Sequence, residues 1–209
     1  MSAEKVTRRY QLRKRADAVE ATRRRITEAA VELHGTLGPA RTTMTAVAEH
    51  AGVQRQTVYR HFADEEQLLA ACSAHFSALY PWPDAAPWRA IADPAARLQT
   101  GLEELYGWYE LTEAMWTNVL RDETLVAALG PALEPMRAYL DDAARALAAG
   151  WGARGRRRAM LLAATRHAVD FHTWRSLARD GGVNRAGVVE LTSAMVSRAA
   201  RPRSGAGSA

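Results

Sequence analysis

The segment from Thr42 to Phe62, TTMTAVAEHAGVQRQTVYRHF, constrains the fold of this chain more than any other stretch. Thr43 is a suitable N-cap for a short helix, and Gly52 supplies the backbone freedom that a tight turn requires. A second helix is predicted from about Gln54 to His61. The residues expected to face inward are Val47, Ala48, Ala51, Val53, Val58 and Phe62.

The remaining face of the second helix is polar and basic. Arginine pairs with guanine and glutamine with adenine, while hydroxyl groups reach phosphates. A helix with these side chains fits the major groove of DNA. A solvated helix hairpin is the alternative for any pattern of this kind. The residues predicted to contact DNA are Thr43, Thr45, Gln54, Arg55, Gln56, Thr57, Tyr59, Arg60 and His61.

The stretch AGVQRQTVYRHF resembles the DNA-binding domain of TetR-family transcriptional regulators. The similarity covers about residues 22 to 80: TRRRITEAAVELHGTLGPARTT resembles the first helix and the loop after it, and FADEEQLLAACSAHF resembles the fourth helix. It implies an all-α fold, in which an N-terminal three-helix helix-turn-helix DNA-binding domain precedes a helical ligand-binding and dimerisation domain. Glu65 departs from the family, which usually has a phosphate-contacting lysine there, whereas Asp64 and Gln67 form a suitable N-cap pair.

The charge distribution agrees with a DNA-binding N-terminus. Residues 1–62 hold 12 Lys and Arg against 6 Asp and Glu, whereas residues 63–209 hold 16 against 17. Positive charge therefore concentrates where DNA would lie. The predicted organisation is a basic N-terminal arm (1–20), the helix-turn-helix domain (21–66), the ligand-binding and dimerisation domain (67–200) and a disordered tail (201–209). The arm, which includes Arg8, Arg9, Arg13, Lys14 and Arg15, either contacts DNA or is a solvated or disordered extension.

The chain beyond residue 80 reads as helical, with no strand pattern. Residues 81–88 form a proline-rich connector, and Asp93 with Pro94 is typical of a helix start. We expect helices over about 94–111, 113–121, 124–149, 154–180 and 184–200, the third of which could break at Pro131 or Pro135.

All six tryptophans lie outside the predicted DNA-binding domain. Large rings fill volume in any helical core, so packing is one interpretation of these residues. The other is an aromatic cavity for a small molecule, which the TetR resemblance places within about residues 94–175. His167, Phe171 and Trp174 would share one helix face. The predicted ligand-binding residues are Trp108, Tyr109, Trp116, His167, Phe171 and Trp174.

The last two predicted helices carry apolar stripes that a monomer would leave uncovered. Two such helices from each subunit can form a four-helix bundle across a twofold axis. The segment FHTWRSLARDGGVNRAGVVELTSAMV also resembles the dimerising end of TetR-like proteins. The predicted dimer contacts are Leu162, Val169, Leu177, Val188, Leu191 and Met195.

Other functional classes have little support. No metal-ligand spacing, nucleophile elbow, P-loop or dinucleotide fingerprint occurs, so we expect no metal, no cofactor and no enzymatic activity. No apolar run approaches the length of a membrane span, and the N-terminus lacks a secretory signal, which predicts a soluble cytoplasmic protein. Cys72, the sole cysteine, is expected to be a buried structural residue.

These features predict a homodimeric transcriptional regulator that leaves a palindromic DNA operator when a small, largely apolar ligand binds. Repression is the favoured mode. The alternatives are a ligand-independent regulator or an activator of the same fold, and a helical enzyme or scaffold that retains the DNA-binding domain.

Overall fold

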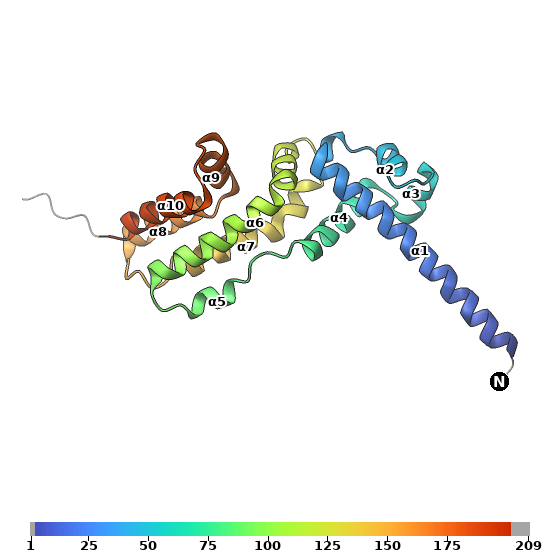
Figure 1. Cartoon of the computed structure of the whole chain (residues 1–209), viewed down its shortest axis with the longest axis horizontal. Coiled ribbons are helices and arrows are strands. Elements are labelled where there is room, and N and C mark those ends of the chain that lie inside the picture. Colours follow the sequence, from blue (N-terminus) through green and yellow to red (C-terminus); the bar gives the residue numbers. More distant parts are fainter. Residues whose placement is uncertain (1–2, 202–209) are drawn as a thin grey trace, which may run out of the picture. The chain divides into compact units, whose positions relative to one another are not determined.

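The computed structural model describes residues 3–201, and every regular element in that range is helical, as the sequence predicts (Figure 1). The predicted disordered tail, apart from Arg201, lies outside the described residues. The elements are α1 (Ala3–Thr36), η1 (Pro39–Arg41), α2 (Met44–His50), α3 (Arg55–His61), α4 (Glu65–Leu79), α5 (Ala85–Ala90), α6 (Pro94–Asp122), α7 (Leu129–Leu147), α8 (Gly155–Ala168), α9 (Phe171–Arg175), η2 (Ser176–Asp180) and α10 (Arg185–Ala200).

The chain forms two compact units whose limits differ from a division after residue 66. The N-terminal unit comprises residues 1–81 and 114–132, and the C-terminal unit comprises residues 82–113 and 133–209. Helix α6 therefore contributes its first part to the C-terminal unit and its last part to the N-terminal unit.

The core of the N-terminal unit lies among α1, α2, α3 and α4. Ile26, Val47, Val58 and Phe62 have no exposed surface, and Cys72 is 3% exposed among them. Burial raises the pKa of the Cys72 thiol to about 12, so this side chain is an inert apolar residue, as predicted. Together these contacts fix the helix-turn-helix on α1 and α4.

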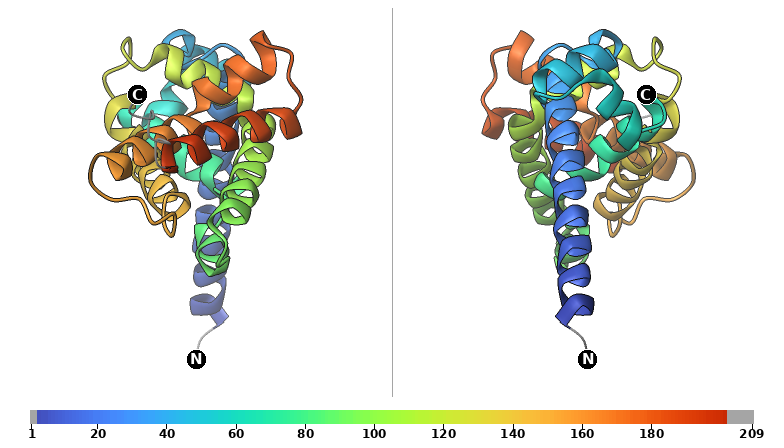
Figure 2. Two further views of the ribbon diagram at one scale, coloured as in Figure 1. Left: turned by 90° about the vertical axis from the view of Figure 1, so that its left-hand side faces the viewer. Right: turned by 90° about the vertical axis from the view of Figure 1, so that its right-hand side faces the viewer.

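Helix α1 begins far earlier than the TetR resemblance indicates. The predicted first helix starts near residue 22, whereas α1 starts at Ala3 and runs without interruption to Thr36. Strong helix formers and the absence of proline and glycine before Gly35 explain the extension. The N-terminal half of α1 extends away from α2, α3 and α4 (Figures 1 and 2). The predicted arm is therefore helical where it is described, and the side chains of Arg8 and Arg9 lie outside the described set.

The C-terminal unit begins with a helix where a connector was predicted. Asp84 caps α5 by accepting a hydrogen bond from the Ala86 N–H, so residues 85–90 are helical despite Pro87. The predicted helix start at Asp93 and Pro94 is confirmed, because Asp93 accepts from the Ala96 N–H.

Three predicted helix limits were wrong. The helices predicted over 94–111 and 113–121 are one continuous α6, since no breaking residue lies between them. The next helix begins at Leu129, with Pro131 in its first turn and Pro135 inside it. The helix predicted over 154–180 ends at Ala168, because Asp170 caps α9, which a π-helical turn, η2, then continues.

Candidate nucleic-acid interface

The turn between α2 and α3 has the geometry that the sequence predicts. Thr43 Oγ1 accepts a hydrogen bond of 3.1 Å from the Ala46 N–H and caps α2. Gly52 adopts a φ of 63°, a left-handed conformation that side chains with a Cβ rarely adopt. The Val53 N–H then donates to the Ala48 carbonyl, and α3 starts at Arg55 with Gln54 as its N-cap.

Helix α3 buries one face and exposes the other. Val58 and Phe62 are fully buried, and Val53 is half-buried. All nine residues predicted to contact DNA lie on α2, on α3 or directly before these helices. Thr57 and His61 are half-buried, and seven are exposed: Thr43, Thr45, Gln54, Arg55, Gln56, Tyr59 and Arg60.

Two arginines order the ends of α3. Arg55 donates a 3.2 Å hydrogen bond to the Tyr59 hydroxyl, one turn along the exposed face. Arg23 of α1 donates 2.7 Å to the His61 carbonyl, and its guanidinium lies 4.2 Å from the centre of the Phe62 ring. A carbonyl at the C-terminal end of α3 thus gains a cationic partner, which stabilises the helix end.

The surroundings of His61 lower the pKa of its ring and so favour the neutral form. Burial lowers the pKa of its imidazole, and the neighbouring Arg60 and Arg23 guanidiniums lower the pKa further. Neutral His61 can donate one hydrogen bond and accept another. It is therefore suited to a polar contact and supplies no charge.

The start of α4 explains the acidic residues that follow α3. Asp64 Oδ1 accepts a 2.8 Å hydrogen bond from the Gln67 N–H, and Gln67 accepts one from the Ala63 N–H. The predicted N-cap pair is confirmed. Glu65 is exposed as the first residue of α4, so a negative side chain stands where the TetR resemblance implies a lysine.

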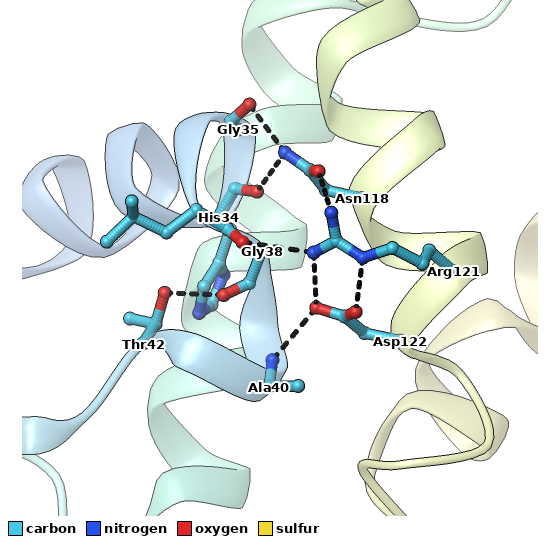
Figure 3. Close-up of polar contacts among 9 residues, drawn as sticks. His34, Gly35, Gly38, Ala40, Thr42, Asn118, Arg121 and Asp122 are labelled. Atoms are coloured by element: carbon cyan, nitrogen blue, oxygen red, sulfur yellow. Dashed lines mark hydrogen bonds and ion pairs between the residues drawn. The ribbon is translucent and has the colours of Figure 1, made fainter.

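A polar network that the sequence did not indicate joins the end of α6 to the segment before α2 (Figure 3). Asn118 donates to the His34 and Gly35 carbonyls at 3.2 and 2.7 Å. Asp122, only 2% exposed, accepts 3.0 Å from the Ala40 N–H and is ion-paired with Arg121. This pairing lowers the pKa of Asp122, so the carboxylate is charged.

The network also depends on Gly38. This residue has a φ of 95°, and a Cβ there would collide with the Arg121 and Asp122 side chains. Arg121 additionally donates 3.0 Å to the Leu37 carbonyl. The α1 to α2 connection, which leads into the Thr43 cap, is therefore held by α6 within the N-terminal unit.

Residues 26–72 match the family model described as bacterial regulatory proteins, tetR family. The match contains α2, the Gly52 turn and α3. This part of the chain is therefore similar to the DNA-binding domain of the tetR family. No curated protein sequence matches the chain.

Solved structures, two of them described as TetR regulators, share the fold of this chain. A TetR-like transcriptional regulator from Rhodococcus sp. RHA1 superposes with a TM-score of 0.60 at 18% identity, over 85% of this chain and 94% of its own. A TetR transcription regulator from Haloarcula marismortui gives 0.57 at 16% identity, over 87% and 97%. A linker variant of HlyIIR gives 0.61 at 14% identity, over 88% and 99%. At such identities the likeness concerns the fold alone.

Four of the six predicted ligand-binding residues lie together. Trp108, Tyr109, Phe171 and Trp174 are buried together in the C-terminal unit, and Tyr109 contacts each of the other three rings. Trp116 belongs to the N-terminal unit, where its ring meets Phe76 edge-on.

His167 is also apart from that cluster. It is exposed at the end of α8 and hydrogen-bonded to Thr173, because the Asp170 cap interrupts the helix on which it would share a face with Phe171 and Trp174. A charged pair lies beside the aromatic cluster. The Arg179 guanidinium lies over the Trp174 ring and forms an ion pair of 2.7 Å with Glu113.

The predicted dimer residues also divide into two groups. Val169 and Val188, at 2% and 0% exposure, belong to the core of the C-terminal unit, because α8 and α10 pack on each other and on α6 (Figure 2). Leu191 is 51% exposed and Met195 is 36% exposed. Leu162 and Leu177 are half-buried. A groove of about 490 Å³ includes Leu177, Leu191 and Met195 in its lining.

Over residues 3–201, no helix is long and apolar enough to cross a membrane. The same residues contain no cluster of three or more histidine, cysteine, aspartate or glutamate side chains suited to a metal ion.

Proposed function

We propose that this protein is a homodimeric, ligand-responsive transcriptional repressor that binds a palindromic DNA operator through α3. The supporting observation is the capped, glycine-linked helix pair whose exposed face carries Arg55, Gln56, Tyr59 and Arg60. Arginine and glutamine can read base edges, whereas Tyr59 and the flanking threonines can position the backbone.

The proposed dimer uses the exposed side of α8 and α10. Leu191 and Met195 leave large apolar surface on α10, which a second copy of the chain would cover in a four-helix bundle. A twofold dimer presents two α3 helices to two half-sites.

The proposed effector is a small, largely apolar molecule in the C-terminal unit, near the cluster of Trp108, Tyr109, Phe171 and Trp174. Two recognition helices must stand about 34–36 Å apart to enter successive major grooves. An effector that binds better to a dimer with another separation would release the operator. The cytoplasm is the proposed location, and the proposed partners are a double-stranded DNA operator, the small-molecule effector and a second copy of the chain.

Sequencing of the genomic DNA fragments that the protein selects tests this function. A repressor of this kind should enrich a palindrome whose half-sites lie one helical turn apart, and a mobility-shift assay should confirm binding. Arg55→Ala should weaken the enrichment of the palindrome, whereas Arg156→Ala, which removes an equal charge from an exposed position of α8, should retain it. Enrichment of random fragments by both variants would contradict specific operator binding.

A further inference from the structure

A cavity of about 650 Å³ lies within the N-terminal unit, apart from the aromatic cluster of the C-terminal unit. Its lining comes from the end of α1, from residues 39–44, from the start of α4 and from the loop between α6 and α7. Most of the lining side chains are apolar, among them Met44, Leu68 and Leu69. The volume lies within the range of small-molecule sites.

The polar network of Figure 3 holds one wall of this cavity in place. His34 and Ala40 both line the cavity, and both have backbone groups that α6 binds, through Asn118 and Asp122 respectively. The wall is therefore fixed by hydrogen bonds to a helix, one of them to a charged carboxylate.

His34 presents an unused polar group to the cavity. His34 is 7% exposed and lines the cavity, and no hydrogen bond to its ring is found among the described residues. Burial lowers the pKa of His34 to about 4, although Asp122 opposes the shift, so the ring is neutral near pH 7. The neutral ring therefore offers a donor and an acceptor to a molecule in the cavity.

Glu65 gives the cavity a negative charge. It lines the cavity from the first turn of α4, is exposed, and has no ion pair among the described residues. Asp64 and Glu66 flank it, so the local charge attracts a cation. A positive ligand group beside Glu65 would keep access to water, while the apolar part of the ligand replaces water against Leu68 and Leu69.

We propose that this cavity binds a largely apolar small molecule with one ammonium group, which pairs with Glu65 while another polar group of the ligand bonds to His34. The site is additional to the effector site proposed for the C-terminal unit. Thr43, the cap of α2, also lines the cavity. If the proposed DNA-binding function holds, an occupant would act directly at the start of the helix-turn-helix.

Calorimetric titration of the full chain with tryptamine, tryptophol and indole-3-acetate tests the proposal without DNA. These probes share one ring and carry a positive, a neutral and a negative side chain near neutral pH. Tryptamine should bind most tightly and indole-3-acetate most weakly. In Glu65→Gln the affinity for tryptamine should fall by about two- to fivefold, as for an exposed ion pair, while tryptophol binding stays unchanged. Glu66→Gln, which alters a neighbour outside the lining, should retain the wild-type order.

A second variant tests whether the probes occupy this cavity. Ala127 lines it but is exposed, so Ala127→Trp fills the space from a position that tolerates a larger side chain. All three probes should bind at least about tenfold more weakly to Ala127→Trp, the equivalent of about 1.4 kcal/mol. Equal affinities for the three probes, unchanged affinities in Ala127→Trp, or no binding of tryptamine at millimolar concentration would each overturn the proposal. None of these results bears on operator binding.

Discussion

Replacement of His34 by methionine should remove a large part of the acid sensitivity of this protein. The His34 ring is almost fully buried, and its pKa falls from 6.5 to about 4, chiefly through burial. In the unfolded chain the same ring takes up a proton below about pH 6.5. Folding stability from the neutral ring is therefore complete above that pH and is lost as the pH falls towards 4.

The magnitude follows from the size of the shift. A shift of one pKa unit corresponds to about 1.36 kcal/mol. The fall of the His34 pKa from 6.5 to about 4 therefore corresponds to about 3 kcal/mol of folding stability. Between about pH 7 and about pH 4.5, His34 should lower the free energy of unfolding by about 2 kcal/mol. Methionine has a similar volume and no proton to gain, so His34→Met should lose about 2 kcal/mol less over the same interval.

Urea titrations followed by far-UV circular dichroism at both pH values would measure this difference. Carboxylates titrate in wild type and variant alike, and their contribution cancels in the comparison. The control is His172→Gln, which removes an exposed histidine from α9. If wild type and His34→Met lose the same stability between the two pH values, His34 is not the buried neutral ring described above.

Three further outcomes concern DNA and assembly. Arg55→Ala and Gln56→Ala should each cost about 1–3 kcal/mol on the selected operator and little on random DNA in a mobility-shift assay; equal losses on both would exclude base readout. Leu191→Glu or Met195→Glu should dissociate the dimer in sedimentation, since each buries an unpaired charge, and an unchanged dimer would reject this interface. Deletion of residues 2–15 removes a net five positive charges and should reduce the slope of log K against log salt by about 0.9 per lost phosphate contact; an unchanged slope means that the extension of α1 does not touch DNA.

The helix-turn-helix was predictable because its signals are local. Thr43 caps α2 through the N–H of Ala46, three residues further along the chain, and Gly52 adopts a conformation that few other residues allow. The pattern of Val58 and Phe62 identifies the buried face without knowledge of its partner. The same holds for Asp93 and Pro94 at the start of α6.

The errors arose where a distant contact or a competing cap decides the structure. Asp170 lies within an apolar repeat that suggests one long helix, but its side chain caps α9 and separates His167 from Phe171. Val188 belongs to an apolar stripe that looks exposed when the helix is considered alone. In the structure, the packing of α10 against α8 buries it. Asp122 binds Ala40 from a remote part of the sequence, and no spacing rule links such residues.

Because α6 belongs to both units, the N-terminal unit cannot be fused to another C-terminal domain as one continuous segment. A fragment cut after Pro81 would lack Trp116, Asn118 and Asp122, which complete the N-terminal unit from a later stretch of sequence. Such a fragment would expose Phe76 and leave the Ala40 amide without its acceptor. A working chimera would therefore have to exchange residues 1–81 and 114–132 together, because the N-terminal unit is discontinuous in sequence.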